Sequence, residues 1–196
     1  MYQADDGTYY LHDYIPTRLF ADYDDESVEQ SKKIWKFKDG DKEVESEYAW
    51  MLLKAIAELA PSIRANKIAL VAVPPSKADK YSPMRSTIDK MVELSETGAL
   101  QIFFGCDKKL INHRDLLLRD EDVATSHRGH RATYEEHLNT ISCGGDHLSR
   151  LWSHFIILDD VSTTGDSMRA CKQILIDHGV PERYITCLAL AKTVWS

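Results

Sequence analysis

FIILDDVSTTGDSM, residues 155–168, is the most informative stretch of this sequence. Its first four residues form a continuous apolar run, which is typical of a strand buried on both faces of a parallel sheet. Asp159 and Asp160 follow at the expected carboxyl end of that strand, where open α/β sheets bind their ligands. A turn of small residues then leads into a helical pattern over 168–178. This succession predicts an α/β fold with a ligand site at the strand end.

The turn 162–167 has the properties of an anion-binding site. The first N–H groups of a helix lack acceptors within the helix, and the helix dipole favours negative charge at that end. Hydroxyl groups and the flexible Gly165 add donors and allow a close approach of the backbone. Two carboxylates suit a sugar diol and the turn suits a phosphate, so the segment predicts a site for a phosphorylated ribose.

The same segment resembles the phosphoribosyl-pyrophosphate (PRPP) loop of the type I phosphoribosyltransferases. The pattern of that loop is four apolar residues, two acids and a T-T-G-x-S/T turn, which this sequence matches. The resemblance implies that Asp159 and Asp160 hold the ribose 2′- and 3′-hydroxyls. It assigns the 5′-phosphate to the turn, with Ser162, Thr163, Thr164, Gly165, Asp166 and Ser167 as the binding residues. A carboxylate beside a phosphate is repulsive, so we expect Asp166 to point outward.

Other structures explain part of this pattern. An ordinary helix N-terminus uses a capping residue such as Asp160 or Ser162, but capping does not require two acids followed by T-T-G. Aspartate pairs at strand ends also bind Mg²⁺ in P-loop ATPases. The sequence contains no G-x-x-x-x-G-K-[ST] motif, which argues against that class.

Composition is that of an ordinary globular enzyme. The 196 residues suffice for one core with a small appendage, and 43% of them are hydrophobic and 28% charged. The net charge of −7 argues against direct binding of nucleic acid. No apolar run reaches membrane-spanning length and the N-terminus has no signal-peptide pattern, so we expect a cytoplasmic protein. The four cysteines form no C-x-x-C pair and are expected to be reduced thiols.

Apolar periodicity predicts the remaining elements. Buried or short strands are expected at 9–15, 34–37, 67–73, 99–104, 155–158 and 184–191. Helices are expected at 44–59, 84–94 and 168–178. Alternation of strands and helices after residue 44 predicts a mostly parallel twisted sheet flanked by helices, as in the type I phosphoribosyltransferases. Residues 1–43 are expected to form a small hood-like extension packed on the core 44–196. A flexible insertion, whose moderate periodicity is best near 115–118 and 134–141, is expected at about 105–145.

A second candidate site is the turn PPSKADKYSP, residues 74–83, which follows the strand expected at 67–73. Ser76 and Lys77 offer N–H donors and a cation to a diphosphate. The resemblance implies that this turn is the pyrophosphate loop and that Lys77 takes part in catalysis. Lys80 and Arg85 can add positive charge. The alternative is that Lys77 and Lys80 are solvated loop cations.

The insertion is rich in basic residues. The resemblance implies that a loop here closes over the reaction centre, and Arg128 and Arg131 of SHRGHR are the preferred catalytic candidates among its cations. The alternative is a solvated charged loop in which the acids at 120–122 balance the cations. A third interpretation is a zinc site, because His127, His130, Cys143 and His147 are spaced H-x₂-H-x₁₂-C-x₃-H. Most structural zinc sites use at least two thiolates, and this one has a single cysteine.

The resemblance implies a PRPP-dependent phosphoribosyltransferase that transfers ribose 5-phosphate to a nucleobase or related amine and releases pyrophosphate. Mg²⁺ is the expected cofactor, held by Asp159 and Asp160 mostly through PRPP and water. Lys192 and Trp195, near the end of the chain, are the candidate acceptor residues.

Within the family, DDVSTTGDS, LHDYIP and IWKFKDG are most similar to the competence-associated (ComF-like) branch, whose acceptor is poorly defined. The alternative function is a non-catalytic PRPP or nucleotide sensor, or an accessory protein of nucleic-acid processing. Members of the family are often dimers, so a homodimer is compatible with the resemblance.

Overall fold

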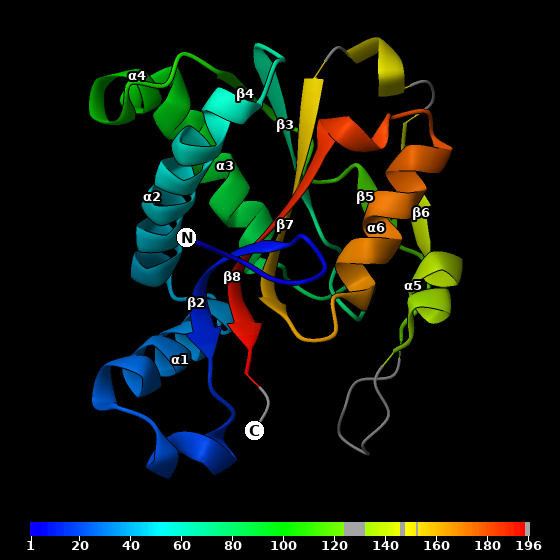
Figure 1. Ribbon diagram of the computed structural model, residues 1–196. Coiled ribbons are helices and arrows are strands. Elements are labelled where there is room, and N and C mark those ends of the chain that lie inside the picture. Colours follow the sequence, from blue (N-terminus) through cyan, green and yellow to red (C-terminus); the bar gives the residue numbers. More distant parts are fainter. Residues whose placement is uncertain (124–131, 146–147, 152, 195–196) are drawn as a thin grey trace.

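A six-stranded sheet forms the centre of the protein, with the strand order β1-β2-β8-β7-β3-β4 (Figure 1). The computed structural model describes residues 1–123, 132–145, 148–151 and 153–194. Neighbouring strands of the sheet pair in parallel, except β1 with β2. The strands are β1 (Tyr2–Gln3), β2 (Tyr9–Tyr14), β3 (Lys67–Ala72), β4 (Lys109–Asn112), β7 (Ser153–Ser162) and β8 (Ile185–Thr193). The predicted α/β class with a mostly parallel sheet is confirmed.

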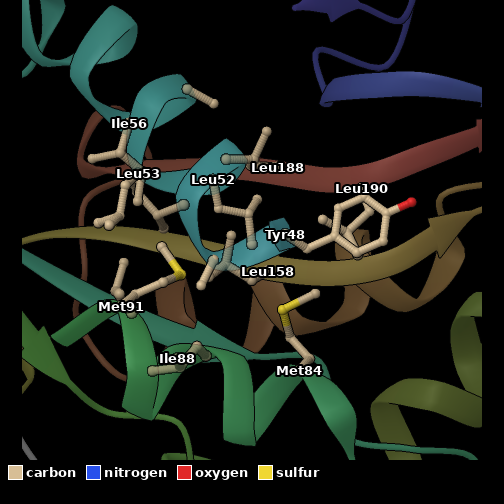
Figure 2. Packing of buried hydrophobic residues seen from close by; sticks show 14 of the residues in the cluster. Tyr48, Leu52, Leu53, Ile56, Met84, Ile88, Met91, Leu158, Leu188 and Leu190 are labelled. Atoms are coloured by element: carbon tan, nitrogen blue, oxygen red, sulfur yellow. The ribbon is translucent and has the colours of Figure 1, made fainter. Parts of the chain in front are cut away.

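Helices cover both faces of this sheet (Figure 1). One face carries α1 (Asp25–Lys38), α2 (Lys42–Leu59) and α3 (Pro83–Glu96), and the other carries α6 (Asp166–Asp177). Figure 2 shows α2 and α3 meeting the sheet through apolar side chains, among them Leu52, Ile88, Leu158 and Leu188. Successive residues of a strand point to opposite faces, so the apolar runs of β3 and β7 serve both layers.

Residues 1–43 extend the central sheet. β2 lies parallel to β8, with Tyr10 opposite Ala189, and α1 follows a short 3₁₀ helix at Thr17–Asp22. The prediction of a strand at 34–37 is wrong, because these residues belong to α1. Asp24 caps that helix by accepting a hydrogen bond from the Ser27 N–H at 2.9 Å. Ile34 and Phe37 are buried three residues apart on one face of this helix. The window IWKF is too short to show that helical spacing, and its apolar residues suggested a strand.

The prediction of a strand at 99–104 is also wrong. These residues form the short helix α4 (Ala99–Phe104), between Gly98 and Gly105, whose φ angles are +85° and +65°. Glycine adopts such left-handed angles without strain and therefore can begin and end a helix of this length. Ile102 is 72% and Phe103 66% exposed, which a buried strand would not allow.

The segment 105–145 contains regular structure in its described parts, 105–123 and 132–145. β4 adds an edge strand beside β3, and β5 (Leu117–Arg119) pairs with β6 (Ile141–Cys143) in a separate antiparallel ribbon. Helix α5 (Tyr134–Thr140) occupies one of the two windows of moderate periodicity, for which no helix was predicted. Thr133 and Glu136 form a capping box at its start. The expectation of an irregular insertion is thus wrong for these parts.

The other predicted strands and helices are present, within a few residues of the expected bounds. The four cysteines, all of them among the described residues, form no disulfide bond. Among the described residues, no helix combines the length and the apolar character needed to cross a membrane.

Candidate functional site

The carboxyl ends of β3 and β7 lie side by side and form the floor of a cavity of about 280 Å³. Ala72 pairs with Leu158, so the turn after β3 and the acids of β7 emerge at the same edge. The cavity is lined by residues from the turn 73–84, from β7 and α6, and from α1, β5 and α5: Val73, Pro74, Pro75, Ser76, Lys80, Tyr81, Ser82, Pro83, Met84, Asp159, Asp160, Val161, Ser167, Lys38, Arg119 and His137.

Asp159 and Asp160 reach opposite faces of the sheet. β7 continues to Ser162, so the two acids lie within the strand rather than after its end. Asp159 accepts a hydrogen bond from the Ser167 hydroxyl of α6 at 3.3 Å. Asp160 lies on the other side, with its Oδ1 3.6 Å from Lys38 Nζ of α1. Strand alternation thus gives each carboxylate a different helix as its neighbour.

The two acids and Lys38 form one electrostatic group. Burial, together with the charge of Asp160, raises the pKa of Asp159 above its ordinary value. Burial opposes the charge of Lys38, but the carboxylates of Asp160 and Asp159 outweigh it and raise the pKa of Lys38 above its ordinary value. A lysine that stays protonated beside two crowded acids balances part of their charge.

The turn between β7 and α6 leads from the end of the strand directly into the start of the helix. Gly165 has a φ of +83° and stands at the N-cap of α6, so the N-cap residue supplies no side-chain cap. The hydroxyl oxygen of Thr164 accepts from the Asp166 N–H at 3.5 Å. The hydroxyl of Ser162 is buried and has no hydrogen-bond partner among the described residues. Asp166 accepts a hydrogen bond from Thr164 at 2.8 Å and pairs with Arg169 at 3.3 Å. Its carboxylate is therefore engaged with the outer side of the helix start.

The turn after β3 is held by the β5–β6 ribbon. Arg119 of β5 donates to the carbonyl oxygen of Pro75 at 3.0 Å and to the hydroxyl of Thr140 at 2.6 Å. Its Nη2 lies 3.2 Å from His137 Nδ1, and since a guanidinium only donates, His137 is the acceptor. Arg119 is 6% exposed, so its hydrogen bonds fix both the turn and the ribbon. Ser76 lies in this turn and its carbonyl accepts from the Val123 N–H at 2.9 Å.

Sequence reasoning missed three basic residues of the cavity. Lys38 was missed because residues 34–37 were predicted as a strand. Lys38 reaches the cavity as the last residue of helix α1. Arg119 was one of several cations in a segment taken to be irregular, and His137 carried no motif. Arg119 contacts Pro75 and His137, and its place depends on the pairing of β5 with β6. These strands lie more than twenty residues apart in the sequence, so no local pattern predicts their pairing.

The structure places the predicted site residues in three groups. Asp159, Asp160, Ser167 and Ser76 line the cavity. The rest of the turn 162–167 and Lys77 lie outside the lining, and Lys77 is exposed. Lys192 is also outside the lining, and its Nζ lies 3.6 Å from Asp6 Oδ2. The predicted positions outside the described residues are Arg128, Arg131, Trp195, His127, His130 and His147.

Within the described ranges, no group of three or more His, Cys, Asp or Glu side chains is arranged to hold a metal ion. The zinc interpretation rests on histidines outside these ranges and stays a prediction. Comparison of the chain with models of known protein families and with curated proteins gives no match.

Proposed function

We propose that this protein is a PRPP-dependent phosphoribosyltransferase, which transfers ribose 5-phosphate to a nucleobase or related amine and releases pyrophosphate. One observation carries the proposal. A single cavity is lined by two adjacent carboxylates and by Ser167 at the start of α6 on one side, and by a turn that a buried arginine braces on the other. These are the groups that a sugar diol, a sugar phosphate and a diphosphate require.

The ribose is assigned to the two acids. Carboxylate oxygens accept hydrogen bonds from hydroxyl groups, and Asp159 and Asp160 both line the cavity. The 5′-phosphate is assigned to the turn 162–167, where the helix start supplies N–H donors and Ser162 supplies a buried hydroxyl without a partner. This arrangement fixes the sugar at two points and so orients its C1 atom.

The leaving pyrophosphate is assigned to the opposite wall. Ser76 and Lys80 line it, and Arg119 supplies a fixed positive charge. Cleavage at an anomeric carbon passes through an oxocarbenium-like state, so the reaction needs no protein nucleophile. It needs an oriented acceptor and stabilisation of the charge that develops on the departing oxygens. Arg119 suits this second role because its hydrogen bonds hold it in place before the reaction begins.

The residues present fit Mg²⁺ of the kind that substrate phosphates hold. Such an ion keeps several waters and takes only one or two carboxylates from the protein, which Asp159 and Asp160 can supply. Asp159 and Asp160 would hold the ion, whose charge would offset part of the negative charge of the substrate phosphates.

A pyrophosphate-release assay tests the proposal. The protein is incubated with PRPP, Mg²⁺ and each member of a panel of purines, pyrimidines and small amines. We expect release that depends on one class of acceptor and falls at least tenfold in Asp160→Asn. If PRPP binds and no acceptor triggers release, the non-catalytic sensor is the better assignment. If PRPP does not bind, both assignments are wrong.

A further inference from the structure

The N-terminal hairpin places a carboxylate on the phosphate turn. Asp6 lies at the tip between β1 and β2, and a Cβ atom added to Gly165 would lie 2.5 Å from Asp6 Oδ2. The same added atom would lie 3.9 Å from the hydroxyl oxygen of Ser162, which is 1% exposed and has no partner among the described residues. The carboxylate and the orphaned hydroxyl therefore both border the helix start that is assigned to the 5′-phosphate.

A lysine holds this carboxylate. Lys192 of β8 pairs in register with Ser162 of β7, so its side chain begins beside the turn, and its Nζ lies 3.6 Å from Asp6 Oδ2. Burial opposes the ionisation of Asp6, but the hydrogen bonds of Thr8 and the charge of Lys192 outweigh it and lower the pKa of Asp6. Both side chains are mostly enclosed, with exposed fractions of 23% and 21%.

We propose that Lys192 is the cation of the phosphate subsite and that Asp6 is its counter-ion in the free protein, displaced when a sugar phosphate binds. This inference rests on the proposed function, because it assumes that the turn 162–167 receives the phosphate. It moves Lys192 from the acceptor side, where the sequence placed it, to the phosphate side.

Charge and space both require the displacement. A phosphate monoester carries nearly two negative charges at neutral pH, so a carboxylate in contact with the same turn repels it. Asp6 Oδ2 also occupies the space over Gly165. Removal of Asp6 from the turn leaves Lys192 without its partner, and the incoming phosphate supplies a stronger one.

The hairpin is built so that its tip can move. β1 has two residues, both exposed, and pairs with β2 alone. The tip itself is a compact unit, because the Thr8 N–H donates to Asp6 Oδ1 at 2.9 Å and the Gly7 N–H donates to the Ala4 carbonyl at 2.9 Å. It can therefore leave the turn as one piece at the cost of few contacts with the core.

Titration calorimetry with ribose 5-phosphate tests the inference on the full chain. Asp6→Asn removes the charge but keeps an oxygen that accepts from Thr8. Asp5→Asn is the matched control, since it removes the same charge from the adjacent exposed position. We expect Asp6→Asn to bind ribose 5-phosphate about tenfold more tightly than the native protein, and Asp5→Asn to bind as the native protein does. Lys192→Met should bind about tenfold more weakly. Adding Asp6→Asn to it should tighten binding by less than Asp6→Asn does alone, because it relieves the repulsion but no longer frees Lys192 for the phosphate.

Each other outcome overturns the inference. Equal tightening in Asp6→Asn and Asp5→Asn shows a general effect of net charge. Tightening by Asp6→Asn that is as large in Lys192→Met as in the native protein shows that Lys192 is not the phosphate cation. The pyrophosphate-release assay separates this failure from failure of the proposed function. If pyrophosphate is released but Asp6→Asn and Asp5→Asn bind ribose 5-phosphate equally well, the inference alone is refuted. Tightening specific to Asp6→Asn without release refutes phosphoribosyl transfer alone. Absence of binding in every variant refutes both.

Discussion

Lys38 Nζ lies 3.6 Å from Asp160 Oδ1, and this contact joins the last residue of α1 to the strand that carries the candidate site. The N-terminal segment therefore supplies a charged group to the cavity in addition to extending the sheet. The ammonium also lies 5.9 Å from the centre of the Tyr14 ring of β2. Residues 14, 38 and 160 thus form a line from the N-terminal strand to the centre of the site.

Removal of the Lys38 charge should destabilise the fold modestly. Lys38→Met leaves Asp159 and Asp160 crowded without a cation, but both partners of the pair are partly exposed, with side-chain fractions of 42% and 30%. We expect a loss of about 0.5–1 kcal/mol in the free energy of unfolding, measured with urea at neutral pH and low salt. Lys36→Met, an exposed lysine of the same helix, serves as the control. Equal losses in the two variants would show that Lys38 has no special partner.

Asp159→Asn should become increasingly stable relative to the native protein as pH rises. The pKa of Asp159 is raised in the folded state, so its favourable contribution is complete below the ordinary carboxyl pKa of about 3.9 and is lost as pH rises through the raised value. Asparagine does not titrate. Urea unfolding between about pH 4 and pH 8 should therefore show a difference that grows to about 1–2 kcal/mol in favour of the variant. Asp107→Asn, at an exposed position before β4, should follow the native curve. A stability difference between Asp159→Asn and the native protein that does not change with pH would contradict the raised pKa of Asp159.

Arg119 should be required for the stability of the turn and the ribbon together. Arg119→Met removes the hydrogen bonds to Pro75 and Thr140 and leaves these acceptors beside a buried apolar side chain. We expect a loss of about 2–3 kcal/mol in the free energy of unfolding. Arg119→Lys should recover little of it, because an ammonium cannot reproduce the planar fork of the guanidinium. A lysine variant as stable as the native protein would refute this role.

Glu45 should make the stability of the α2–α3 face sensitive to acid. Its carboxylate accepts hydrogen bonds from Tyr81 at 2.7 Å, Ser86 at 2.8 Å and Lys42 at 2.9 Å. Burial opposes its ionisation, but these bonds outweigh it and lower the pKa of Glu45 below 4.5. The stabilisation is therefore present above the ordinary pKa and is lost as pH falls through the lowered one.

Glu45→Gln should cost about 1–2 kcal/mol at neutral pH and should flatten the acid limb of the stability curve. Glu43→Gln, in the exposed first turn of α2, should change neither. Urea unfolding at a series of pH values measures both effects. An acid limb that keeps its slope in Glu45→Gln would assign the pH dependence to other carboxylates.

Sequence alone predicted the parts of the site that are local. The acids of β7, the turn 162–167 and the helix after it lie within one stretch of chain, so their order fixes their arrangement. The carboxyl ends of parallel strands share one edge of a sheet, which predicted that Asp160 and Ser76 lie near each other. The parallel pairing of Ala72 with Leu158 agrees with this prediction.

Residues that reach the site through distant pairing escaped prediction. Lys38 depends on α1, whose four-residue window 34–37 has strand-like composition, while its cap and its buried face become visible only over fourteen residues. Arg119 and Asp6 reach the site through a ribbon and a hairpin tip, and these pairings join segments whose own sequences do not specify their partners. Short windows therefore misplaced helices, and local patterns could not supply contacts between distant segments.

Binding of PRPP tests the central claim most directly. Titration calorimetry with PRPP in the presence of Mg²⁺ should give saturable binding to the native protein and to Asp107→Asn. Asp160→Asn should bind at least tenfold more weakly, because the amide lacks the charge and one of the oxygens that accept from the ribose hydroxyls, while circular dichroism shows an intact fold. Undiminished affinity in Asp160→Asn, with the fold intact, would contradict the account.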